Sequence, residues 1–213
     1  VTVTKHFVQV VGSGGCYFLS LNIFDRLADI GLDGSVHPGL AERWETSPDL
    51  KTWTFYLVKN ATWHDGKKFT SADVKFTIEG INNFQHPGTS YLKDIERVET
   101  PDDYTAVLKL KVPDATVLDK VGSWTGYTSI LPKHLYDGTD WKTNPHTVPP
   151  GPPVGTGAFK FESHTADSYT VVANEKHHWG RPYLDRIIQR HFGTVAAEYM
   201  ALEKGEIDYA IDV

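Results

Sequence analysis

The 213-residue chain has one cysteine and one methionine, and its 21 Lys and Arg residues are outnumbered by 27 Asp and Glu residues. The lone Cys16 cannot form a disulfide within the chain, so no disulfide framework is expected to support the fold. The net charge of −6, with histidine counted as neutral, provides no basic surface for a phosphate backbone. The sequence therefore predicts no nucleic-acid partner.

Long apolar runs are also missing. No segment approaches the roughly 18 consecutive apolar residues that a membrane-spanning helix needs. The first residues lack the basic start and the apolar core of a secretion signal. The 40% apolar and 23% charged composition is that of an ordinary globular protein, so we expect a folded chain that does not span a bilayer.

Motifs for nucleotide binding and catalysis are absent. A glycine-rich segment, 12–15, precedes a helical pattern, but neither GxGxxG nor GxxxxGK[ST] occurs, and no lysine follows the glycines. Neither GxSxG nor a protease cysteine motif is present. Asp65 and Asp73 occupy turn and helix-cap positions that account for them. The sequence therefore predicts no catalytic residues and no cofactor.

Ten histidines raise the question of a metal site, and the adjacent pair His177 and His178 is the strongest candidate. No HxxxH or HExxH spacing occurs. If the pair lies on a strand, its two side chains point to opposite faces. We therefore expect solvated surface histidines and no metal ligands.

Hydrophobic periodicity predicts a mixed α and β chain without internal repeats. The expected strands are 1–11, 52–58, 95–100, 104–112, 158–162, 169–173, 184–192 and 207–211, and the expected helices are 17–28, 71–83, 115–122 and 194–204. A proline-rich segment, 137–154, is expected to be an irregular crossing between two structural units.

Two helices have clear start signals. Thr70 or Ser71 is expected to cap the helix at 71–83, whose Val74, Ile78 and Ile81 recur at helical spacing.

Thr194 is expected to cap the later helix and Gly205 to end it. Val195, Tyr199 and Leu202 are expected to face inward.

Several segments together resemble one protein family. PGLAERWE (38–45), KTWTFYL (51–57) and WHDGKKFTSADV (63–74) are similar to the signature stretch of family 5 solute-binding proteins, the peptide and nickel receptors of ABC importers. Further matches in the family's order lie at 130–134, 153–160, 173–174, 179–182, 184–185 and 201–208. Nearly the whole chain is covered, which makes the resemblance specific.

The resemblance implies a mixed α/β fold of the periplasmic binding protein type II kind. Such proteins have two lobes, and this chain corresponds to the N-terminal lobe, with the C-terminal lobe absent. The chain is then either a fragment or a truncated homologue. The family pattern implies a core subdomain from residues 1–36 and 153–213, with an inserted subdomain at 37–152.

The resemblance also implies a function: capture of a peptide or similar solute for delivery to the membrane subunits of an ABC permease. The location would be periplasmic or extracellular, with or without a membrane anchor in a longer precursor, and the receptor would be a monomer. Two alternatives stay open, a receptor for nickel or a metal chelate, and a hydrolase of small peptides or sugars.

Candidate ligand contacts come from three places in the chain. A loop after a first strand is a common ligand site in α/β sheets. Two aromatic residues, Trp124 and Tyr127, could form apolar walls of the site or simply belong to the core. Thr156 carries a hydroxyl near the expected hinge, between two glycines that are expected to allow a close backbone approach. These candidates are Ser13, Gly14, Gly15, Cys16 and Tyr17 in the loop, the aromatic pair Trp124 and Tyr127, and Thr156.

Overall fold

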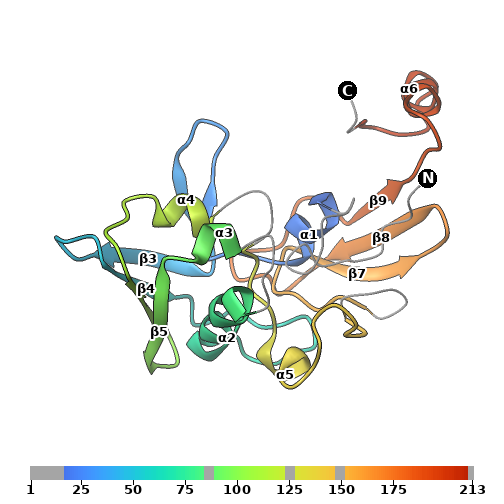
Figure 1. Cartoon of the computed structure of the whole chain (residues 1–213). Helices are drawn as coiled ribbons and strands as arrows, with labels where there is room; N and C mark the ends of the chain where they lie inside the picture. Colours follow the sequence, from blue (N-terminus) through green and yellow to red (C-terminus); the bar gives the residue numbers. More distant parts are fainter. Residues whose placement is uncertain (1–16, 84–88, 123–127, 147–151, 211–213) are drawn as a thin grey trace.

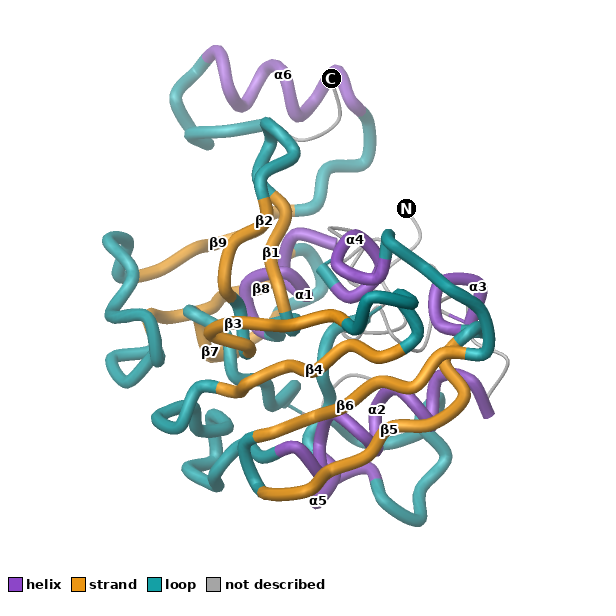
Figure 2. Tube along the Cα trace, turned by 90° about the vertical axis from the view of Figure 1, so that its left-hand side faces the viewer, coloured by secondary structure: helices purple, strands orange, loops and turns teal. Residues whose placement is uncertain are grey.

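Three antiparallel sheets organise the part of the chain that the structure describes (Figures 1 and 2). The computed structural model describes residues 17–83, 89–122, 128–146 and 152–210. Its helices are α1 (Tyr17–Ile23), α2 (Ser71–Asn83), α3 (Thr89–Leu92), α4 (Val117–Val121), α5 (Lys133–Tyr136) and α6 (Val195–Glu203). Its strands are β1 (Ala28–Ile30), β2 (Val36–Pro38), β3 (Ala41–Thr46), β4 (Thr52–Leu57), β5 (Ile95–Asp102), β6 (Thr105–Leu110), β7 (Phe159–His164), β8 (Ser168–Ala173) and β9 (Arg186–Arg190).

The largest sheet has the strand order β3-β4-β6-β5. Its central strand β4 alternates as predicted, with Trp53, Phe55 and Leu57 buried on one face. Phe55 lies opposite Ala106 of β6, and Trp53 lies opposite Leu108, so apolar side chains from neighbouring strands meet on that face. The predicted hairpin of β5 and β6 is confirmed.

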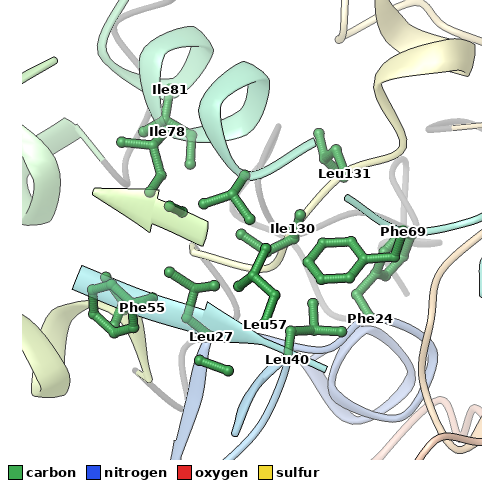
Figure 3. Packing of buried hydrophobic residues seen from close by; sticks show 14 of the residues in the cluster. Phe24, Leu27, Leu40, Phe55, Leu57, Phe69, Ile78, Ile81, Ile130 and Leu131 are labelled. Carbon is green, nitrogen blue, oxygen red and sulfur yellow. The ribbon is translucent and has the colours of Figure 1, made fainter. Parts of the chain in front are cut away.

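Helix α2 covers the apolar face of this sheet. Val74, Ile78 and Ile81 are buried, and Figure 3 shows Ile78 and Ile81 directed from the helix toward the strands. The helix begins at Ser71 as predicted, whereas capping by the hydroxyl of Thr70 or Ser71 stays a prediction. At this end the carboxylate of Asp73 accepts from the amide of Thr70 at 3.0 Å. This bond satisfies an amide at the helix start that no turn of the helix can reach.

The second sheet has the order β7-β8-β9, and α1 packs against β7. Figure 1 shows this unit beside the larger sheet, joined to it through α1 and the segments around it. One continuous apolar core joins the two sheets: it includes Phe24 and Leu40 near the junction, and Phe159 and Val171 in the second sheet.

Some predicted elements are wrong in extent or kind. The helix expected at 17–28 ends at Ile23, because the chain then enters β1. The short strands β1 and β2 pair with each other, and they and β3 were missed. Residues 207–210 form no strand, while the strand expected at 1–11 lies outside the described residues.

Helix α6 begins and ends as predicted but faces differently. The hydroxyl of Thr194 accepts from the amide of Ala197 at 3.2 Å. Gly205 has φ +71°, as a residue that ends a helix should. Val195, Tyr199 and Leu202 are nevertheless exposed, and the buried residue of α6 is Ala201. The expectation of an inward apolar face is therefore wrong, because α6 extends away from the sheets (Figure 2).

Residues of the predicted core subdomain and of the predicted inserted subdomain pack together, and the structure does not separate the two subdomains. The hairpin of β1 and β2 crosses the boundary expected near residue 36, and the core is shared. The division into two subdomains stays a prediction. Within the described ranges, no helix has the length and apolar character needed to cross a membrane.

Candidate functional site

The glycine pair around Thr156 packs directly on the end of α1. The amide of Gly157 donates to the carbonyl of Ile23 at 2.9 Å. A Cβ atom on Gly155 would lie 1.8 Å from the carbonyl oxygen of Ile23, so no larger residue fits there. The close backbone approach predicted for this segment is confirmed.

His64 holds the same segment from the other side. Its amide donates to the carbonyl of Gly155 at 2.8 Å, and its Nδ1 accepts from the amide of Gly155 at 3.3 Å. Its Nε2 lies 3.0 Å from the carbonyl of Gly157 and must be the donor, since a carbonyl only accepts. Burial lowers the pKa of His64 to about 4, so the ring is neutral at neutral pH.

A turn after β8 closes the arrangement. The side-chain amide of Asn174 donates to the carbonyl of Gly157 at 3.0 Å. Further along, the indole of Trp179 donates to the carbonyl of Gly39 at 2.9 Å, and Asn60 donates to the carbonyl of His178 at 3.1 Å. Leu40, the residue after Gly39, donates to the carbonyl of Arg26 at 2.8 Å. Since Arg26 belongs to the connection between α1 and β1, these bonds place the turn against that connection.

Asp25, in that connection, faces two imidazole rings. Its Oδ2 lies 3.7 Å from Nε2 of His177 and 3.9 Å from Nδ1 of His178. Burial would raise the pKa of the Asp25 carboxyl, but the two histidines outweigh burial and lower it. Burial alone would lower the pKa of His177, but the attraction of the Asp25 carboxylate is stronger than the effect of burial, so the pKa of His177 is raised. For His178 burial dominates, and its pKa is lowered.

The expectation that His177 and His178 are solvated surface histidines is wrong, and so is its premise that they lie on a strand. His177 and His178 lie in a turn, not on a strand, so the alternation of side chains does not apply. Their ring centroids are 4.3 Å apart. The side chains are only 11% and 1% exposed, so neither is a solvated surface histidine.

Of the predicted ligand contacts, the structure describes few. Ser13, Gly14, Gly15, Cys16, Trp124 and Tyr127 lie outside the described residues, and Tyr17 is described only as the first residue of α1. Thr156 is fully buried. Its hydroxyl lies beside the Asp25 carboxylate, without a hydrogen bond of normal geometry. Ligand contact by these residues stays a prediction.

The described neighbours of the aromatic pair do approach the same region. A Cβ on Gly122 would lie 3.0 Å from the carbonyl of Ala28, and Ile130 donates to the carbonyl of Asp25 at 3.0 Å. The segment 155–157 contacts the end of α1, as described above. Gly122 and Ile130, on the two sides of the 123–127 segment, therefore lie close to residues 22–28, as does the segment 155–157.

A separate hollow of about 480 Å³ lies between α2 and β5. Its lining is mixed in charge and includes Glu79, Lys93 and Arg97, and none of the predicted ligand residues belongs to it. Ligand sites are predominantly apolar with a few converging polar groups, so this charged hollow is a weaker candidate.

Sequence reasoning missed Asp25, His64 and Asn174. His64 and Asn174 lie in family motifs, but nothing in those motifs predicted their contacts, and their partners are backbone groups about 90 and 17 residues away. No spacing rule applies to such pairs. The glycines at 155 and 157 were a usable signal, since they marked a close backbone approach.

Comparison with known proteins identifies the family. Residues 35–213 match the family described as bacterial extracellular solute-binding proteins, family 5, middle part. The dipeptide-binding protein of Escherichia coli K12 is 31% identical over 93% of this chain. A Brucella ovis protein named for ABC transporter peptide binding is 38% identical over 96% of the chain. The chain spans only 41% and 38% of these two relatives.

Solved structures agree with the predicted fold class. The Helicobacter pylori protein DppA, in complex with the peptide STSA, has a TM-score of 0.81 and 27% identity, and covers 96% of this chain with 44% of its own. NikZ of Campylobacter jejuni, in complex with Ni(L-His), has a TM-score of 0.84 and 25% identity, with 97% and 41% covered. The chain belongs to family 5 of the bacterial extracellular solute-binding proteins.

Proposed function

We propose that this chain is part of a receptor that captures a peptide or similar small solute outside the cytoplasmic membrane and delivers it to an ABC permease. The observation that carries the proposal is family membership over most of the chain, with relatives named for peptides and dipeptides. The receptor would be periplasmic or extracellular and monomeric.

The local geometry supports a binding role. The segment 155–157, the end of α1 and the turn after β8 are tied together by hydrogen bonds that use backbone carbonyls and amides. Such a frame can present neighbouring loops to a ligand with little loss of entropy on binding. We propose that four parts of the chain contribute to the solute site: the loop that ends at Tyr17, and the residues Trp124, Tyr127 and Thr156.

A nickel chelate is the second candidate solute. It is supported by the likeness to NikZ, whose structure holds Ni(L-His). A hydrolase of peptides or sugars has less support: the carboxylates of Asp65 and Asp73 accept from the amides of Lys67 and Thr70, which gives both a structural role. A hydrolase would therefore need catalytic residues other than Asp65 and Asp73.

The test is a nuclear magnetic resonance titration of the isotope-labelled chain with dipeptides, tetrapeptides and Ni(L-His). This method detects millimolar binding, which suits a chain that corresponds to less than half of its relatives' length. The proposal predicts chemical-shift changes for amides of residues 22–28 and 155–157 with peptides. Mass spectrometry should recover the peptides intact.

Other results would separate the alternatives. Shifts with Ni(L-His) alone would favour the chelate receptor, and cleaved peptide would favour a hydrolase. Peptide-induced shifts confined to the hollow between α2 and β5 would contradict the proposed site. A Trp124→Ala variant should weaken the peptide response, while Tyr183→Ala, at a fully exposed aromatic residue, serves as the matched control.

A further inference from the structure

One carboxylate and two imidazoles converge from segments about 150 residues apart in the chain. Asp25 belongs to the connection between α1 and β1, and His177 and His178 belong to the turn after β8. Their ligand atoms all lie within 4.8 Å of one another. We propose that Asp25, His177 and His178 form a binding site for a divalent transition-metal ion such as Zn²⁺.

The hydrogen bond of His177 sets the direction of its free nitrogen. Its Nδ1 lies 3.2 Å from the carbonyl of Gly180, which can only accept, so Nδ1 carries the hydrogen. In the neutral ring, Nε2 then presents its lone pair toward Oδ2 of Asp25, 3.7 Å away. Two electron-rich atoms facing each other require a cation or a proton between them. A backbone carbonyl on the distal nitrogen is also the usual partner of a metal-bound histidine.

Burial makes this arrangement costly without a positive charge. Oδ2 of Asp25 and Nε2 of His177 are buried and have no hydrogen bond of normal geometry to the described residues. The third ligand atom is Nδ1 of His178, the nitrogen of that ring that faces Oδ2 of Asp25. The His178 side chain is 1% exposed. The separations of 3.7 and 3.9 Å are too long for hydrogen bonds. Buried polar groups are normally paired or coordinate metals, so these atoms fit a ligand set.

The distances suit a small ion after a modest contraction. Bonds of about 2.0 to 2.2 Å to nitrogen and oxygen put tetrahedral ligands roughly 3.3 Å apart. The two distances from Asp25 are therefore within about 0.6 Å of that geometry. The ligand atoms of the two rings lie at most 4.8 Å apart and must approach by up to about 1.5 Å to bind one ion.

The donor set selects the class of metal. Two imidazoles and one carboxylate suit Zn²⁺, Ni²⁺ and Cu²⁺, whereas Mg²⁺ and Ca²⁺ prefer oxygen ligands alone. Three protein ligands leave a fourth position for water. A bound ion would cross-link the α1–β1 connection to the turn after β8, and would stabilise the native state whatever solute the receptor carries.

The test uses the full chain after removal of metal with a chelator. Thermal unfolding is followed with added ZnCl₂, with MgCl₂ as the comparison ion, and Co²⁺ is titrated while its visible absorption is recorded. The proposal predicts one Co²⁺ bound per chain with a tetrahedral spectrum. It also predicts a rise in melting temperature of about 5 to 10 °C at Zn²⁺ concentrations near 100 times Kd, and no rise with Mg²⁺.

The variants Asp25→Asn and His178→Gln identify the ligands, and His37→Gln, at an exposed histidine, is the matched control. Loss of one ligand should weaken Zn²⁺ binding by at least about 100-fold, while His37→Gln should bind as the wild type does. If a variant fails to fold, the stoichiometry and spectrum of Co²⁺ in the wild type still decide. Absence of a tetrahedral Co²⁺ spectrum, or equal Zn²⁺ affinity in folded Asp25→Asn, would overturn the site and leave an Asp25–His177 ion pair.

Discussion

His64 and Gly155 hold each other by two backbone-directed bonds: the amide of His64 donates to the carbonyl of Gly155 at 2.8 Å, and the amide of Gly155 donates to Nδ1 of His64 at 3.3 Å. The second bond requires the neutral ring, because protonation of Nδ1 would replace its lone pair with a hydrogen. This pairing ties the segment after β4 to the segment before β7. It also makes the fold sensitive to pH.

The first prediction concerns that sensitivity. The pKa of His64 is about 4 in the folded chain and near 6.5 when unfolded, so the unfolded state binds more protons between these values. Stability should therefore fall as pH drops from about 6.5 to 4, by on the order of 3 kcal/mol from this residue. Urea unfolding at several pH values, in a chelator, measures it. His64→Gln should flatten the dependence, and an unchanged slope in that variant would contradict this role.

The second prediction concerns the close contact of Gly155 with α1. Gly155→Ala would place a methyl group 1.8 Å from the Ile23 carbonyl oxygen, so backbone must move and stability should fall by about 3 kcal/mol or more. Gly34→Ala is the control: it has φ +80° but nothing within 4 Å, so it should cost only about 1 kcal/mol. Denaturant unfolding compares the two. Equal losses would show that the contact with the Ile23 carbonyl relaxes at little cost and does not limit position 155.

The third prediction tests the orientation of α6. Tyr199 is 38% exposed and Ala201 only 4% exposed, although the sequence pattern favoured an inward Tyr199. Tyr199→Lys should change the free energy of unfolding by less than about 0.5 kcal/mol, whereas Ala201→Lys should cost about 2 kcal/mol or more because it buries a charge. Thermal unfolding of both variants decides. A larger loss for Tyr199→Lys would restore the orientation expected from the sequence.

The fourth prediction compares this chain with a protein that has the full length of its relatives. A closed pocket buries about 70 to 90% of a small ligand, and one lobe would leave roughly half of that surface in water. With about 100 to 200 Å² of apolar surface left wet, the cost is about 2.5 to 5 kcal/mol. The chain should therefore bind its solute roughly 70-fold to several thousand-fold more weakly. Calorimetric titration of both proteins measures the ratio, and equal affinities would place the whole pocket within residues 1–213.

Local rules were sufficient where an element's own residues carry the signal. Helix α2 could be predicted because a cap at its start is followed by Val74, Ile78 and Ile81 at helical spacing. Strand β4 could be predicted because alternation reports which face is buried. The family motifs lie mainly on this scaffold, so the sequence also determined the family, while the identity of the solute depends on other residues.

Only the tertiary structure decided the features that depend on partners far apart in the chain. Strands β1 and β2 have three residues each, too few for a period to be read, and they form because they pair with each other. The exposure of α6 depends on what packs against it, which its own sequence does not contain. His177 and His178 meet Asp25 because Trp179 and Asn60 bond to backbone carbonyls and hold the turn in place. Bonds to a backbone carbonyl can be made with any residue type as partner, so no sequence pattern specifies them.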